Sequence, residues 1–130
     1  GGRLLSGETM GTPADADTWD FDAIALDENG IAGMWELTLL VEQWTTKPLE
    51  FPPMEIEYID LTAISMDVDE AWAILEQQGL ARPFFTWELF KPLKPGITNP
   101  CYAFYVGGGQ YLFVDIITGA AWSGASAAAD

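Results

Sequence analysis

The sequence predicts an α+β fold in which short helices pack on one face of an antiparallel sheet, and three observations support this class. The first is a capped segment with helical periodicity at residues 67–79. The second is a set of segments in which apolar and polar residues alternate, which is typical of strands with one solvated face. The third is the run Gly107-Gly108-Gly109 between two apolar segments, which is typical of a β-hairpin.

The chain has 130 residues, which is in the size range of a single domain. Residues 1–17 are rich in small and polar residues and lack periodicity, so we expect a flexible lead-in, and we expect residues 123–130 to be a flexible tail. One α+β domain would then span residues 18–122. Its halves, 18–63 and 64–122, each show a helical pattern followed by strands, which suggests an α-β-β(-β) duplication.

A first helix is expected to begin near Trp19, because Asp17 or Thr18 can cap its start and acidic residues follow in the first turn. Asn29-Gly30 would end this helix. The residues that share one helical stripe are Phe21, Ile24, Ala25 and Glu28.

A second helix is specified more fully. Asp67 is a good N-cap, and Glu70 stands three residues later, in the position of the capping-box partner. Gly79 provides a left-handed stop. The apolar residues between these ends follow the spacing of one helical face: Val68, Ala71, Trp72 and Leu75.

Strands are expected at residues 34–44, 54–61, 84–90, 102–106 and 110–116. The last two would form the hairpin around the three glycines, with the facing pairs Val106–Gln110, Phe104–Leu112 and Tyr102–Val114. The opposite face of this hairpin would then carry Ala103, Tyr105, Tyr111, Phe113 and Asp115. A bulge at the glycines would reverse this assignment.

The charge excludes several function classes. Twenty Asp and Glu oppose five Lys and Arg, which gives a net charge of −15, and the chain has no His. Direct nucleic-acid binding needs clustered cations, and an anionic membrane surface would repel this chain. No apolar run approaches the roughly 18 residues of a transmembrane helix, so we expect no membrane insertion. The acidity indicates either a well-solvated surface or a decoy that occupies a basic nucleic-acid-binding surface.

The sequence nominates no catalytic residue, no metal ligand and no cofactor. Serine and cysteine nucleophiles need a nearby base, and His is absent. Cys101 is the single cysteine, so it forms no internal disulfide and makes no zinc site. Asp67-Val68-Asp69 begins like a calcium loop, but Trp72 occupies the position that requires glycine. We therefore expect a protein that is not an enzyme.

Three segments resemble the PepSY family: residues 66–72 with D-E-A, residues 100–106 with an aromatic strand, and residues 111–119 with V-D-x-x-T-G. The resemblance covers residues 64–122. It implies a fold like that of peptidase propeptides and β-lactamase-inhibitor proteins, with a secreted or periplasmic location after signal-peptide removal and a binding or inhibitory role. A Pro-rich insertion between Phe90 and Cys101 departs from the pattern, and the first half lacks the V-D-x-x-T-G ending.

The candidate binding residues are Tyr105, Tyr111 and Phe113, because aromatic side chains on an open sheet face provide large contact area at low entropic cost. Alternatively, the first half of the domain or a partner subunit covers them. The leading hypothesis is a non-enzymatic, exported module that binds a protein, with an inhibitory role implied by the resemblance. The second hypothesis is the acidic decoy.

Overall fold

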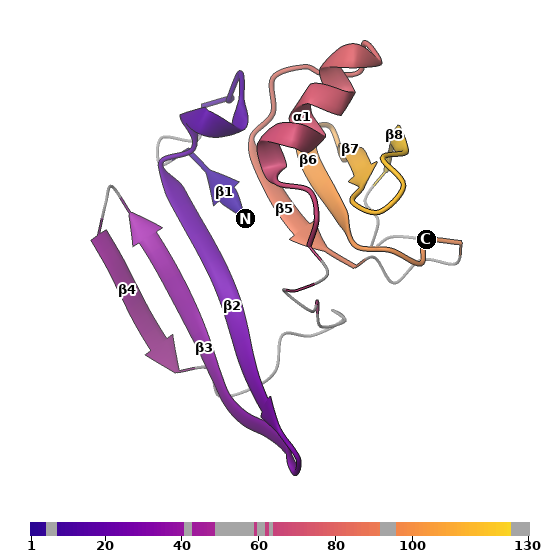
Figure 1. Ribbon diagram of the computed structural model, residues 1–130. Coiled ribbons are helices and arrows are strands. Elements are labelled where there is room, and N and C mark those ends of the chain that lie inside the picture. The colour runs from indigo at the N-terminus through magenta and orange to yellow at the C-terminus, as the bar shows by residue number, and fades with distance from the viewer. Residues whose placement is uncertain are drawn as a thin grey trace.

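The computed structural model describes residues 1–4, 8–40, 43–48, 59, 62, 64–91 and 96–125. Its centre is one eight-stranded antiparallel sheet with strand order β4-β3-β2-β1-β5-β6-β7-β8 (Figure 1). The strands in chain order are β1 (Gly2–Arg3), β2 (Thr18–Asp27), β3 (Gly30–Leu40), β4 (Gln43–Pro48), β5 (Thr86–Phe90), β6 (Cys101–Gly107), β7 (Gln110–Asp115) and β8 (Ala121–Ala125). The helices are the 3-10 helix η1 (Pro13–Asp15) and the α-helix α1 (Val68–Gln77).

The expected α+β class with several helices on one sheet face is wrong, because the described part of the chain is β-rich and contains a single α-helix. The helix expected near Trp19 is strand β2. Trp19, Phe21 and Ala23 alternate with Asp20 and Asp22, and the strand pairs with β3 along its whole length. Asn29-Gly30, expected as a helix stop, lies at the turn of this hairpin.

The α-β-β duplication is also wrong as predicted. Residues 18–48 form three consecutive strands, and none of the described residues of the first half is α-helical. Lys47-Pro48 ends the edge strand β4, where proline is tolerated because its missing N–H faces away from the ladder. The strand expected at residues 54–61 lies outside the described residues apart from Ile59.

The helix expected after Asp67 is confirmed. The Asp67 carboxylate accepts a hydrogen bond from the Glu70 N–H at 2.8 Å, and the Glu70 carboxylate accepts one from the Asp67 N–H at 3.4 Å. At the other end Gly79 adopts a φ of 70°, the left-handed conformation that a side chain disfavours. The face of α1 with Ala71, Trp72 and Leu75 is buried.

The core lies between α1 and strands β5 to β7. The Trp72 ring packs against Phe84 and Phe104, with ring centroids 5.0 and 5.2 Å away. The Tyr102 hydroxyl donates to the Met66 carbonyl at 2.9 Å and so ties the sheet to the segment before α1. Figure 1 shows α1 in front of β5 and β6, whereas no described α-helix lies in front of β2, β3 and β4.

Part of the expected lead-in contributes to this architecture. Strand β1 lies between β2 and β5 and pairs with both, so it connects strands β2 to β4 with strands β5 to β8 in one sheet. Met10 is fully buried in the core and exchanges backbone hydrogen bonds with Phe84. In the expected tail, Ser123–Ala125 belong to β8, and residues 126–130 lie outside the described part.

The hairpin of β6 and β7 has the register expected for Phe104–Leu112 and Tyr102–Val114. The pairing next to the glycines differs, because Gly107 rather than Val106 faces Gln110. The register shifts between Tyr105 and Gly107, so Val106 is the extra residue of a bulge. The bulge lies beyond the Phe104–Leu112 and Tyr102–Val114 pairs and leaves the faces of these residues unchanged.

Replacing the helix cap tests how α1 is held. Asp67→Ala removes the acceptor for the first turn, and we expect it to lower the free energy of unfolding by about 1 kcal/mol in a denaturant titration. The matched control is Glu76→Ala, which removes an exposed acid from the last turn of the same helix. A cap variant as stable as this control would contradict the assignment.

Candidate functional site

The strands β2, β3 and β4 have two chemically different faces. Trp19 on β2 makes an edge-to-face contact with Trp87, with ring centroids 5.1 Å apart, and Trp87 belongs to the core beneath α1. Because side chains alternate along a strand, Phe21 lies on the same helix side as Trp19. Asp20 and Asp22 lie on the back side.

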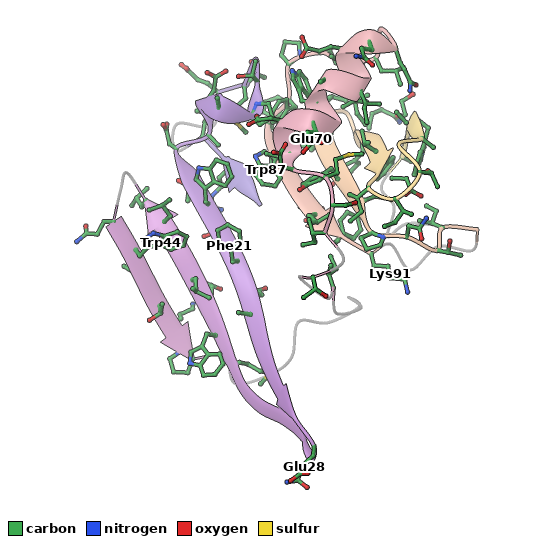
Figure 2. All side chains as sticks on the ribbon, in the orientation of Figure 1. Phe21, Glu28, Trp44, Glu70, Trp87 and Lys91 are labelled. Carbon is green, nitrogen blue, oxygen red and sulfur yellow. The ribbon has the colours of Figure 1, made fainter. Side chains whose placement is uncertain are left out.

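The helix side of these three strands carries an apolar surface that no described helix covers, here named the wing face. Its pairs are Phe21↔Leu37 between β2 and β3, and Leu39↔Trp44 between β3 and β4. The Phe21 and Trp44 rings lie 5.9 Å apart, and Figure 2 shows both side chains on the strands away from α1. The residues of the wing face are Phe21, Trp35, Leu37, Leu39 and Trp44.

Exposure distinguishes the wing face from ordinary core. Phe21, Trp35 and Trp44 are 44%, 40% and 53% exposed, and these are among the few large apolar side chains in the described residues that face solvent to this degree. Gly33 helps to place one of them, because a Cβ at that position would collide with the Trp35 ring. The glycine therefore lets the indole lie flat along β3 and present its outer surface.

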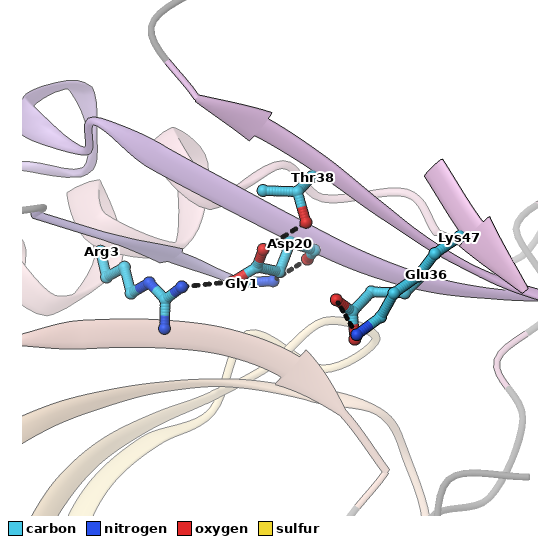
Figure 3. Close-up of polar contacts among 6 residues, drawn as sticks. All are labelled: Gly1, Arg3, Asp20, Glu36, Thr38 and Lys47. Atoms are coloured by element: carbon cyan, nitrogen blue, oxygen red, sulfur yellow. Dashed lines mark hydrogen bonds and ion pairs between the residues drawn. The ribbon is translucent and has the colours of Figure 1, made fainter. Parts of the chain in front are cut away.

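The back side of the same strands is polar (Figure 3). Asp20 pairs with Arg3 at 3.3 Å and accepts a hydrogen bond from the Thr38 hydroxyl at 3.0 Å. Glu36 pairs with Lys47 at 3.6 Å. Burial, and then the neighbouring carboxylates of Glu36 and Asp20, raise the pKa of Asp22. The three strands thus form an amphipathic sheet, in which the described charged side chains Asp20, Asp22, Glu36 and Lys47 lie on the side opposite the wing face.

The predicted binding residues come together on the back side of the other half of the sheet. Tyr105 and Tyr111 are directly paired across β6 and β7, with ring centroids 5.0 Å apart. Phe113 stacks on Tyr111 at 5.8 Å. The contacts continue at both ends, and we name the whole set the aromatic row: Phe85, Tyr105, Tyr111, Phe113 and Trp122.

The members of the aromatic row differ in access to solvent. Phe113 is only 2% exposed and packs with Phe90, Tyr111 and Trp122 in a small second core. Tyr105 and Tyr111 are half-buried. Phe113 is therefore a buried member of the row, and a partner would meet the two tyrosines first.

This difference predicts separate effects on stability. Phe113→Ala removes a buried ring, and we expect the free energy of unfolding to fall by about 3–5 kcal/mol. Tyr105→Ala, at a half-buried position of the same row, should cost clearly less. Equal losses of unfolding free energy for the two variants in chemical unfolding would contradict this difference in burial between Phe113 and Tyr105.

The V-D-x-x-T-G segment builds a turn after β7. The Asp115 carboxylate accepts hydrogen bonds from the backbone N–H groups of Ile117 and Thr118 at 2.8 and 2.9 Å. The Asn99 amide donates to the same carboxylate at 3.1 Å, and Gly119 adopts a φ of 74°. Burial alone would raise the pKa of Asp115, but these hydrogen bonds outweigh burial and lower it. In this structure the V-D-x-x-T-G segment therefore stabilises the turn after β7.

The lowered pKa makes stability depend on pH in a defined direction. The charged Asp115 stabilises the fold above the unfolded-state pKa of about 4, and this contribution disappears as the pH falls through the lower folded-state value. We expect Asp115→Asn to cost about 1–2 kcal/mol at pH 7, a loss that shrinks in acid. Urea titrations from pH 7 to pH 2.5 measure this, with Glu28→Gln, at an exposed turn, as the control for net charge. A loss that is the same at every pH would contradict the assignment.

The described residues include one thiol and many carboxylates. Cys101 is fully buried, and burial, followed by the charge of Asp115, raises the pKa of its thiol to about 12. Its thiol donates to the Asn99 carbonyl at 3.4 Å. In the described residues no group of three or more Cys, Asp or Glu side chains is placed to hold a metal ion. Nor does this part of the chain contain a helix long and apolar enough to cross a bilayer.

Acidic side chains occur on several surfaces of the described structure. Asp69 and Glu70 are exposed on α1, and Glu28 lies at the tip of the β2–β3 hairpin (Figure 2). Asp20 and Asp22 occupy the back side of β2. These described acidic side chains are therefore spread over more than one surface.

Comparisons with known protein families, with curated proteins and with solved structures found no match. The PepSY resemblance therefore stays a prediction. Sequence reasoning placed Tyr105, Tyr111 and Phe113 on one sheet face but missed Phe85 and Trp122. It also missed the wing face, because residues 18–29 were interpreted as a helix. The alternation of Trp19, Phe21 and Ala23 with Asp20 and Asp22 was the available signal.

Proposed function

We propose that this chain is a non-enzymatic module that binds a protein partner, and that it works outside the cytoplasm, in the periplasm or after secretion. The single observation that carries the binding function is the wing face. Support for export, and for an inhibitory effect on the partner, comes from the PepSY resemblance alone.

The wing face has the properties of a protein-recognition surface. Contiguous exposed apolar surface on a soluble protein is a common mark of an interaction site. Aromatic residues also dominate the energetics of protein interfaces. Phe21 and Trp44 come from β2 and β4, the outer two of three paired strands, so hydrogen-bonded backbone holds their spacing. A partner would therefore meet anchors that need little ordering on binding.

The aromatic row is a second candidate contact surface in this proposal. It lies on the opposite side of the sheet and at the opposite end of the strand order. Tyr105 and Tyr111 are its accessible members. The acidic decoy is less well supported, because the described acidic residues are spread over several surfaces.

The test begins with immobilised chain and an extract of the producing organism. A retained protein is identified, purified and titrated against the chain by calorimetry. We expect the double variant Phe21→Ser and Trp44→Ser to weaken this binding at least tenfold, because it removes the two most exposed rings of the wing face. Denaturant unfolding checks that the variant is folded.

Two further variants make the result specific. Ile117→Ser removes a 56% exposed apolar side chain from the turn after β7 and should leave binding unchanged. Tyr105→Ala with Tyr111→Ala reports whether the aromatic row contributes. A partner that binds the wing-face variant as tightly as the wild type would overturn the assignment of this face.

A further inference from the structure

We propose that the wing face binds a segment of a basic protein, one in which apolar side chains are flanked by lysine or arginine. This inference rests on the proposed function and adds the chemical class of the partner. It follows from three features of the described residues: the charge around the wing face, its size, and its position beside the core.

The first feature is charge. Residues 18–48 contain six acidic side chains and one lysine, and the whole chain carries −15. Lys47, the lysine of this region, already pairs with Glu36 on the back side. The wing-face residues are uncharged, and the described charged residues of these strands, Asp20, Asp22, Glu36 and Lys47, lie on the back side. The excess of negative charge over the whole chain therefore favours a partner that carries positive charge next to its apolar contact residues.

The second feature is size, and it argues against a second copy of this chain. Three strands spaced about 4.8 Å apart, with five residues of about 3.3 Å each, present an area of roughly 240 Å². Stable interfaces between folded proteins bury about 800 Å² on each partner. A self-complex through this face would be small, and it would also bring two chains of charge −15 together. An area of this size suits one extended or helical segment.

The third feature is the continuity of the wing face with the core. Trp87 contacts Tyr102 beneath α1 at 5.9 Å and contacts Trp19 at 5.1 Å, and Trp19 precedes Phe21 on the same side of β2. The apolar surface therefore runs outward from the core without a polar break. A bound segment would extend the core over β2, β3 and β4. The segment would bury the apolar side chains that face the wing face, and its opposite side would stay in solvent.

Two synthetic peptides of ten residues test the partner class. One alternates lysine with leucine and tryptophan, and the other has glutamate at every lysine position. Fluorescence anisotropy of labelled peptide is measured with the full chain. We expect the basic peptide to bind at least tenfold more tightly than the acidic one, and Phe21→Ser with Trp44→Ser to weaken its binding at least tenfold. Ile117→Ser should bind like the wild type.

The salt dependence of peptide binding distinguishes an apolar contact from charge attraction alone. Between 0.05 and 0.5 M NaCl we expect the association rate of the basic peptide to fall, because screening weakens steering, while its dissociation rate changes little. A complex that disappears entirely at 0.5 M NaCl would overturn the apolar contact. Equal affinity for the two peptides would overturn the basic class.

The remaining outcomes identify other occupants, and each would overturn the proposal. Dimerisation in sedimentation velocity that the double variant abolishes would assign the face to a second copy. Binding to phosphatidylcholine vesicles that the same variant abolishes would assign it to lipid. A large loss of folding stability in that variant, with no peptide binding, would assign it to another part of the same chain. If a purified partner depends on the wing face but the basic peptide does not bind, the binding function stands and the partner class fails.

Discussion

The geometry of this fold is set by the mismatch between one short helix and a wide sheet. Ten helical residues give α1 a length of about 15 Å. Eight strands spaced about 4.8 Å apart make a sheet roughly 34 Å wide. One helix of this size covers only part of the sheet, and the core under α1 is that part. Trp19 of β2 still packs against this core, whereas the side chains of the wing face are not part of it.

Strands β2 to β4 are joined to strands β5 to β8 only through the short strand β1 in the described sheet. This strand has two residues, yet it pairs with β2 on one side and β5 on the other. Its Gly2 lies directly beneath the Trp87 ring, where a Cβ would collide with the indole. The glycine thus allows Trp87 to lie flat across β1 and contact Trp19 on β2. Through this pair of rings the covered and uncovered halves share one apolar surface.

The sequence predicted the elements that local chemistry determines. Helix α1 has its own cap and stop, and the β6–β7 pairing follows from apolar alternation around three glycines, so both could be predicted. Strand β2 could not be assigned correctly from end signals, because Asp17, Thr18 and Asn29-Gly30 suit a helix as well as a hairpin. Long-range pairing decided between them, since β3 matches β2 residue by residue. Tyr105, Tyr111 and Phe113 of the aromatic row followed from the hairpin, whereas the wing face required β2 to be interpreted as a strand. The place of β1 between β2 and β5 has no local signal at all.

An open apolar face beside an edge strand carries a risk of aggregation, and the sequence counters it in two ways. The edge strand β4 ends in Lys47-Pro48, and lysine and proline both oppose the addition of another strand. The net charge of −15 keeps copies of the chain apart over distances of about a Debye length. Repulsion of this kind acts only between like charges, so it protects the wing face from its own copies and leaves it accessible to a positively charged partner. The acidity and the exposed aromatic side chains therefore have one physical explanation in common.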